Sequence, residues 1–226
     1  MRAVAVGRWC GRLSRAGLRG VSALWLAAGM CGMVAASEFV ELSFAAVDEG
    51  RGAEPVVAFA VMDGRMVSVV LPGHRAGPAR RAGGRGEIPL LGHDPVSRLA
   101  LLDGSAVVAG TKYELGDSRV LKPGAMVQVA GGAQARVTGW ARRHGGRVLP
   151  VSLLRVNYPA VPPRAGTPLL DGAGRVVAIG YQAEPGRKSV GYALPVVVVA
   201  RVLADLERDR KVVRTWLCVT LREGAD

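Results

Sequence analysis

Short apolar runs separated by turn residues recur along most of the chain. Segment 55–73, PVVAFAVMDGRMVSVVLPG, predicts two strands about an Asp-Gly turn, and segment 87–104, EIPLLGHDPVSRLALLDG, predicts two more about an Asp-Pro turn. Similar runs follow between residues 123 and 158, and segment 162–181 again places an Asp-Gly turn between two apolar runs. Many short strands at regular spacing predict an all-β sandwich or barrel.

Two segments depart from this pattern. In 195–211, PVVVVARVLADLERDRK, apolar residues recur at helical spacing opposite a charged face, and proline in the first turn is a normal helix start. The stretch Gly73 to Gly86, GHRAGPARRAGGRG, has no hydrophobic period and predicts a mobile surface loop, with a basic arm for an anionic partner as the alternative. We expect a helix over 196–210 that docks on the strands through Val199, Val202, Leu203 and Leu206.

The N-terminus has the pattern of a targeting signal. Five arginines and no acid precede the apolar run VSALWLAAGMCGMVAAS, which ends in small residues near Ala36. We expect residues 1–36 to be a cleaved signal peptide and the protein to be exported, either periplasmic or secreted. An uncleaved membrane anchor is the alternative, although the apolar stretch 21–36 is shorter than the ~20 residues that span a bilayer.

Composition narrows the range of partners. The formal charge is +12, and beyond residue 36 it is +7, from 25 Lys and Arg against 18 Asp and Glu. The basic residues are 26 Arg and 4 Lys, spread thinly without interleaved aromatics, so nucleic acid is not expected as a partner. His74, His93 and His144 are scattered, and Cys218 alone follows the signal, so we expect no metal site, no internal disulfide and no cofactor.

Several stretches, taken together and in order, resemble the trypsin-like serine proteases of the HtrA (Deg) type. GHDPVSRLALL is similar to the D-x-x-x-D-L-A-L-L segment of that family, and LKPGAMVQVAGG to its L-x-x-G-x-x-V-x-A-x-G strand. GTPLLDGAGRVVAIGY resembles G-G-P-L-x-D-x-x-G-x-V-x-G-I, and SVGYALPVVVVARVLADL resembles G-I-G-F-A-I-P with its closing helix. The resemblance covers about residues 45–217.

The resemblance implies an all-β, chymotrypsin-like fold of two six-stranded β-barrels with a C-terminal helix. Within a domain of residues 37–226, the N-terminal barrel is expected at about 45–115 and the C-terminal barrel at about 120–195. The tail KVVRTWLCV resembles the R-x-W-L-G-V segment that leads into a PDZ domain in that family. Because only nine residues follow Leu217, we expect no PDZ domain.

The same resemblance places unsuitable residues at the catalytic positions. Aligned on the P-L of G-N-S-G-G-P-L, Ala165 takes the place of the nucleophile, while Leu71 and Arg98 take those of the histidine and the aspartate. A triad needs a hydroxyl, an imidazole and a carboxylate, and these three side chains supply none of them. Pro163 stands where a backbone N–H is implied for the oxyanion hole, and proline has no N–H. We therefore expect essentially no peptidase activity.

Two other site assignments stay open at this level. Thr167, His74 and Asp94 lie two to four residues from the three positions and offer a shifted triad, although each residue along a strand advances by about 3.3 Å. A misplaced gap would instead hide a nucleophile such as Ser152 or Ser189. In either case the protein would be an active serine-type endopeptidase.

Peptide binding does not need a triad. The resemblance implies that substrate is held as an added strand along the edge of the second barrel, here residues 180–183, and that residues 189–191 line the pocket for its first side chain. The competing interpretation is that both segments are ordinary barrel strands. The implied peptide-binding residues are Gly180, Tyr181, Gln182 and Val190.

The leading hypothesis is an exported, non-catalytic homologue of the trypsin-like proteases that binds a peptide or protein segment. A structural or regulatory subunit of an active protease is a further alternative, which rests on fold analogy. Arg98 is the most informative residue, because an arginine in the position of the aspartate should find a buried carboxylate or extend to solvent. The partner and the oligomeric state are left open.

Overall fold

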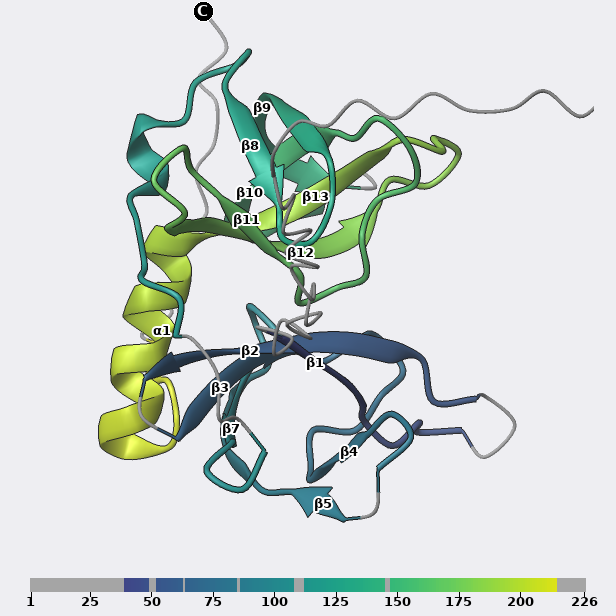
Figure 1. Cartoon of the computed structure of the whole chain (residues 1–226), viewed down its shortest axis with the longest axis vertical. Coiled ribbons are helices and arrows are strands. Elements are labelled where there is room, and N and C mark those ends of the chain that lie inside the picture. Colours follow the sequence, from purple (N-terminus) through teal and green to yellow (C-terminus); the bar gives the residue numbers. More distant parts are fainter. Residues whose placement is uncertain are drawn as a thin grey trace, which may run out of the picture. The chain divides into compact units, whose positions relative to one another are not determined.

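Thirteen strands, one α-helix and one short 3-10 helix make up the described part of the chain (Figure 1). This part belongs to one compact unit, Ala35–Asp226. The predicted signal peptide, Cys218 and the part beyond Arg214 of the tail that resembles a PDZ linker lie outside the described residues. The computed structural model describes residues 39–48, 52–62, 64–84, 86–107, 112–144 and 147–214.

The first half of the fold is an antiparallel sheet in the order β5-β4-β1-β2-β3-β7-β6. The hairpins predicted from segments 55–73 and 87–104 are confirmed as β2-β3 and β6-β7. Strand β3 also pairs with β7, which places Val67 opposite Leu101. The bounds are β1 (Phe39–Ser43), β2 (Pro55–Met62), β3 (Arg65–Val69), β4 (Ala79–Arg81), β5 (Glu87–Ile88), β6 (Leu90–Asp94) and β7 (Leu99–Asp103).

This half differs from the expected closed barrel of six strands. Its seven described strands form an open sheet with β5 and β6 at the two ends, and the sheet begins at Phe39 rather than near residue 45. The prediction of a loop throughout Gly73 to Gly86 is also wrong, because β4 lies within it and pairs with β1. Ala79 is buried while Arg80 and its neighbour are exposed, so a single apolar residue anchors β4 and leaves no hydrophobic period to detect.

The second half is the closed barrel that the resemblance implies. Six strands follow the order β10-β13-β12-β11-β8-β9, and β9 returns to β10 to close the ring. The hairpin predicted around Asp171 is confirmed as β11-β12, with Pro168 opposite Ile179. The bounds are η1 (Ser118–Val120), β8 (Met126–Val129), β9 (Gln134–His144), β10 (Arg147–Asn157), β11 (Pro168–Leu170), β12 (Val176–Ala183) and β13 (Val190–Pro195).

The helix and both halves share one buried cluster. Helix α1 (Val196–Asp209) follows Pro195 directly, as predicted, and contacts β6 and β7 of the sheet and β12 and β13 of the barrel (Figure 1). Phe59 from the sheet, Ile179 from the barrel and Val199 from the helix are all fully buried in this cluster. Burying a side chain of this size contributes about 1.5–3 kcal/mol, so the shared cluster ties the three parts together. No helix in the described segments is long and apolar enough to cross a bilayer.

A turn of the second half, residues 163–167, is hydrogen-bonded directly to the first sheet, and we call this contact the seal. The Val57 N–H on β2 donates to the Ala165 carbonyl over 2.8 Å, and the Ser68 hydroxyl donates to the Val57 carbonyl over 2.8 Å. Gly166 follows with φ +90°, and a Cβ added there would lie 1.9 Å from the Val57 carbonyl oxygen. Glycine is therefore required at this position, both for its backbone conformation and for the close approach of β2.

Substituting Gly166 tests this seal. Gly166→Ala is expected to lower the free energy of unfolding by about 3 kcal/mol or more, because left-handed strain and a backbone clash add together. The matched control is Gly174→Ala, where φ is +78° but nothing lies within 4 Å of the added Cβ. The control isolates the strain, with an expected loss of about 1–2 kcal/mol. Equal losses in urea denaturation of the two variants would contradict the close approach.

Candidate functional site

Two of the three predicted triad positions pack against one buried cluster of the first sheet, and the third is linked to that sheet through its backbone. Leu71 and Ala165, which come from different halves, pack against the same buried cluster of that sheet. The Val70 N–H, next to Leu71, donates to the Arg98 carbonyl over 2.8 Å, while Val57 of the same sheet holds Ala165. The fold thus gathers residues that are nearly a hundred positions apart in the sequence.

The side chains at these positions offer no acid–base chemistry. Leu71 and Ala165 are half-buried hydrocarbons, and the Arg98 guanidinium only donates hydrogen bonds. Pro163 is half-buried too, and its ring nitrogen carries no hydrogen. That these residues stand at the positions of a former triad and oxyanion hole stays a prediction.

Arg98 neither pairs with a buried carboxylate nor extends to solvent, the two outcomes expected from the sequence. Its Nε donates to the Tyr181 hydroxyl over 2.6 Å, its Nη2 donates to the Gln182 side-chain carbonyl over 3.1 Å, and its Cζ lies 3.8 Å from the centre of the Tyr181 ring. Nη1 is buried and has no hydrogen-bond partner in the described part. The guanidinium is therefore held by neutral groups of β12 rather than by a carboxylate or by solvent.

The backbone of Arg98 is also unusual. Its φ is +60°, a left-handed value that is uncommon for a residue other than glycine. Such conformations cost of order 1–3 kcal/mol and persist where the surroundings enforce them. Here the turn between β6 and β7 directs the side chain across to β12 of the other half.

The free edge of β12 is shorter than the sequence implies. The Gly180 N–H donates to the Thr167 carbonyl and the Gly180 carbonyl accepts from Gly166, each over 2.8 Å, so Gly180 is paired within the fold. The prediction that Gly180 pairs with a peptide is therefore corrected. The open part of the strand starts at Tyr181.

Ala183 is the best-placed residue on this edge. The Glu184 N–H donates to the Val190 carbonyl of β13 over 2.8 Å. Because backbone groups alternate sides along a strand, Ala183 directs its own N–H and carbonyl away from β13. Ala183 is exposed, and within the described residues no strand pairs with β12 beyond Gly180 on that side.

The predicted side-chain pocket is filled. A Cβ added at Gly191 would meet Pro162 Cβ at 3.2 Å, so the proline ring occupies the space in front of β13. Val190 is buried in the barrel, and the Ser189 hydroxyl donates to the Asn157 side chain over 3.3 Å. Val190 is therefore a barrel residue rather than a contact for a peptide side chain. The Pro-Pro pair at 162–163 is the sequence signal that we missed.

The alternative catalytic sets are not assembled. The Thr167 hydroxyl donates to the Arg164 carbonyl over 2.7 Å, and His74 Nε2 accepts from the Glu54 N–H over 3.2 Å. Asp94 is engaged with Ser97, so none of these partners belongs to the proposed set. Ser152 lies within β10, and neither it nor Ser189 is hydrogen-bonded to an imidazole in the described part.

Asp94 anchors the turn that carries Arg98. Its carboxylate is buried, accepts from the Ser97 hydroxyl at 2.6 Å and the Ser97 N–H at 3.0 Å, and forms an ion pair with Arg214. Burial alone would raise the pKa of Asp94, but the hydrogen bonds from Ser97 and Arg214 outweigh it, so the pKa lies below the usual 3.8. For the adjacent His93, burial lowers the pKa, and the Asp94 charge opposes this only in part.

Asp94→Asn tests the anchor through its pH dependence. The pKa of Asp94 is lower in the folded than in the unfolded chain, so its contribution is complete above the unfolded value and is lost as the pH falls through the folded one. At neutral pH the free energy of unfolding of the variant should be about 2 kcal/mol lower than that of the unmodified protein. This difference should shrink below about pH 4. Urea denaturation at neutral pH and below about pH 4 measures this difference in the free energy of unfolding. Asp117→Asn is the control: this half-exposed carboxylate pairs with Arg119 and caps η1, and Asn can keep the cap, so stability should change little. A difference that does not vary with pH would contradict this role.

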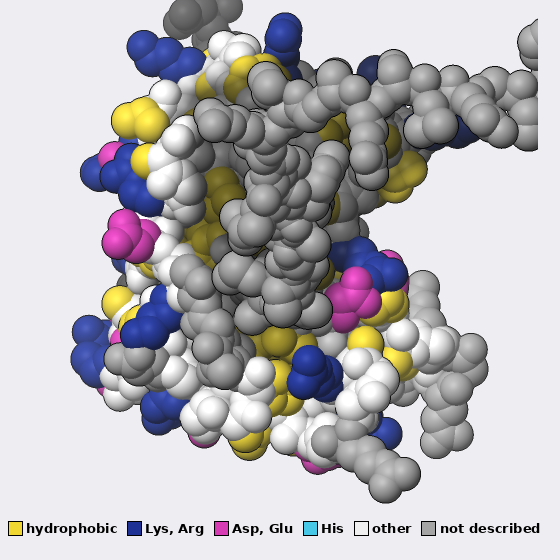
Figure 2. All heavy atoms as spheres, viewed as in Figure 1, with side chains coloured by type: hydrophobic (Ala, Val, Ile, Leu, Met, Phe, Trp, Pro, Cys, Tyr) yellow, Lys and Arg dark blue, Asp and Glu magenta, His cyan; other side chains and the backbone are white. Residues whose placement is uncertain are grey.

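Charge on the surface is mixed. On the face drawn in Figure 2, Lys and Arg side chains are scattered among acidic and apolar ones rather than gathered in one patch. Within the described residues, no group of three or more His, Cys, Asp or Glu side chains is placed to hold a metal ion. The two described cavities, of about 640 and 470 Å³, are lined by residues other than those of the predicted site.

The closed barrel, the partner sheet and the C-terminal helix define a protein of the chymotrypsin-like fold. The solved structure of the HtrA-type protease AlgW with a tripeptide matches it with a TM-score of 0.60 at 20% identity, over 80% of this chain and 64% of that one. A protease of M. tuberculosis in its active form matches with a TM-score of 0.55 at 18% identity, over 75% of this chain and 81% of that one.

In sequence, the chain is similar to proteins described as probable periplasmic serine endoprotease DegP-like. The protein from Marinomonas sp. (strain MWYL1) is 34% identical over 148 residues, 59% of this chain and 30% of the relative. The one from Pseudomonas fluorescens is 35% identical over 146 residues, with the same coverage. The resemblance to trypsin-like proteases of the HtrA type is thereby confirmed. The chain spans about 30% of the length of these relatives, and no protein-family model matches it.

Proposed function

We propose that the protein is an exported, non-catalytic homologue of HtrA-type proteases that binds an extended peptide or protein segment along β12. The observation that carries the proposal is the exposed Ala183, whose backbone N–H and carbonyl point away from β13 toward a side without a paired strand in the described part. An incoming segment would add a strand there through main-chain hydrogen bonds. Export is supported by the similarity to relatives described as periplasmic.

The side chains at the gathered positions support the absence of catalysis. Removing one oxyanion donor costs about 10²–10³ in rate, and a triad supplies much more. Leu71, Arg98 and Ala165 bring no nucleophile or base, and Pro163 brings no N–H. Pro162 in front of Gly191 also leaves little room for a side chain of the bound segment at that point, so binding there rests on the backbone.

A fluorophosphonate probe tests the absence of a reactive serine. The mature protein is expected to show no labelling above that of Ser152→Ala and Ser189→Ala variants, because neither hydroxyl is activated by a base in the described part. An active HtrA-type protease labelled in parallel is the positive control. Stoichiometric labelling that disappears when one serine is replaced would show an active peptidase instead.

Ala183→Pro tests strand addition. Proline removes the outward N–H but is tolerated on an open strand edge, so the thermal midpoint should change little while affinity for extended peptides falls about tenfold or more. Fluorescence anisotropy with a pool of labelled decapeptides rich in Val, Thr and Ser measures the affinity.

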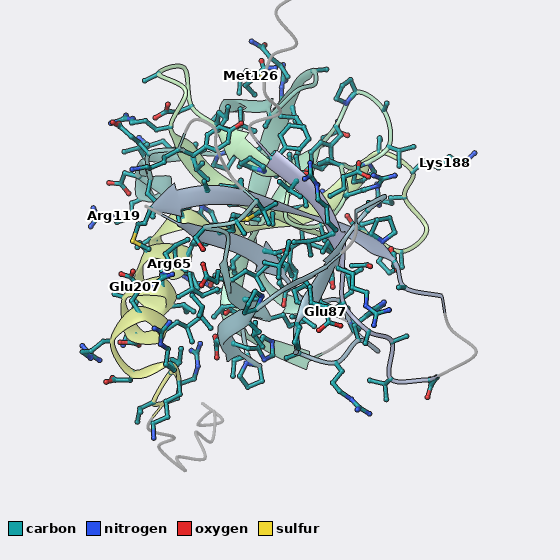
Figure 3. All side chains as sticks on the ribbon, turned by 60° about the horizontal axis from the view of Figure 1, so that its bottom comes forward. Arg65, Glu87, Arg119, Met126, Lys188 and Glu207 are labelled. Carbon is teal, nitrogen blue, oxygen red and sulfur yellow. The ribbon has the colours of Figure 1, made fainter. Side chains whose placement is uncertain are left out.

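The matched control is Lys188→Ala, because Lys188 is exposed in the same β12-β13 hairpin and points away from the body (Figure 3). It should bind like the unmodified protein. Peptide binding that is unchanged in Ala183→Pro would refute the use of this edge.

A further inference from the structure

Arg98 carries a positive charge that the described residues do not balance. Two arginines of the second half have carboxylates, since Arg155 pairs with Glu184 at 2.8 Å and Arg164 pairs with Glu41. Arg98 instead donates to the Tyr181 hydroxyl and the Gln182 amide, while Nη1 is buried without a partner in the described part. A half-buried charge held by neutral acceptors is costly, and a carboxylate would offset that cost.

The position of Arg98 is enforced at a cost in backbone strain. The left-handed φ of +60° would be relieved by glycine or asparagine, but the chain holds arginine there with its side chain across β12. Strained backbone conformations are frequent at binding and switch sites, and they persist where the surroundings enforce them. The strain shows that the position of Arg98 is enforced, and the unbalanced charge points to a ligand that meets the guanidinium.

The guanidinium also lies beside the proposed binding edge. Tyr181 and Gln182, which it contacts, directly precede Ala183 on β12. Two residues along a strand cover about 7 Å, so a segment paired at Ala183 carries its next side chains past Arg98. A segment bound along β12 would therefore meet both the free backbone groups of Ala183 and the charge of Arg98.

We propose that Arg98 receives a carboxylate of the segment bound on β12, from an acidic side chain or from the end of a peptide. The inference rests on the proposed function and names its ligand chemistry. The carboxylate displaces the Gln182 amide from Nη2, and the buried Nη1 becomes its second donor once that amide has moved away, since the planar fork of arginine matches the two oxygens of a carboxylate. A charge-assisted pair then replaces a neutral hydrogen bond.

Three pools of labelled decapeptides test the assignment. All are rich in Val, Thr and Ser; the first has one Glu and an amidated end, the second has Gln and an amidated end, and the third has Gln and a free carboxylate end. In fluorescence anisotropy the first or the third pool should bind about tenfold more tightly than the second. A gain in the first pool identifies an acidic side chain, and a gain in the third identifies a chain end.

Variants separate the role of Arg98 from general electrostatics. Arg98→Gln should bind all three pools equally, at the affinity of the second pool, and Arg98→Lys should keep part of the preference because the charge remains. Gln182→Ala should keep or increase the preference, because it removes the competing acceptor. Lys188→Gln also removes one positive charge, from the β12-β13 hairpin rather than from the turn that carries Arg98, and should leave the preference unchanged.

The outcomes distinguish this inference from the proposed function. Equal and measurable binding of all three pools to the unmodified protein would overturn the role of Arg98 and leave strand addition standing. A tenfold preference that persists in Arg98→Gln would overturn that role in the same way. Absence of binding by every pool would refute strand addition, and the role of Arg98 with it. If Arg98→Gln does not fold, as judged by circular dichroism, loss of the preference in Gln182→Ala would still overturn the displacement of the amide.

Discussion

The backbone hydrogen bond between Val57 and Ala165 holds the turn of the second half on the first sheet. Gly166 makes this contact feasible, because any other residue would place a Cβ on the Val57 carbonyl. The contact sets where residues 163–167 lie relative to β2, and therefore brings Ala165 to the cluster that also holds Leu71. The geometry of the candidate site depends on this seal, since it joins segments that are far apart in the chain.

The second constraint is the sign of the charge at residue 98. A carboxylate accepts hydrogen bonds, whereas a guanidinium has only donors and needs acceptors. In this protein the acceptors are the Tyr181 hydroxyl and the Gln182 amide, so the side chain bridges the two halves at the edge of β12. The guanidinium at this position therefore holds β12 through hydrogen bonds that it donates.

Local patterns predicted much of the fold correctly. The hairpins β2-β3, β6-β7 and β11-β12 were visible as apolar runs about Asp-Gly and Asp-Pro turns, and α1 as a stripe of Val199, Val202, Leu203 and Leu206. Strand β4 was missed because its pairing with β1 depends on a partner some forty residues away. Closure of the barrel in the second half but not in the first likewise depends on which strands meet, and not on the pattern within any of them.

The amino-acid sequence by itself determined which chemical groups are present: hydrocarbons at residues 71 and 165, a guanidinium at residue 98 and no N–H at residue 163. Those facts limit the chemistry whatever the fold, because a side chain cannot supply an atom that it lacks. Only the tertiary structure decided what those groups meet. The pairing of Gly180 inside the fold, the proline ring before Gly191 and the bridge from Arg98 to β12 all join distant segments, and contacts of that kind leave no periodic trace in the chain.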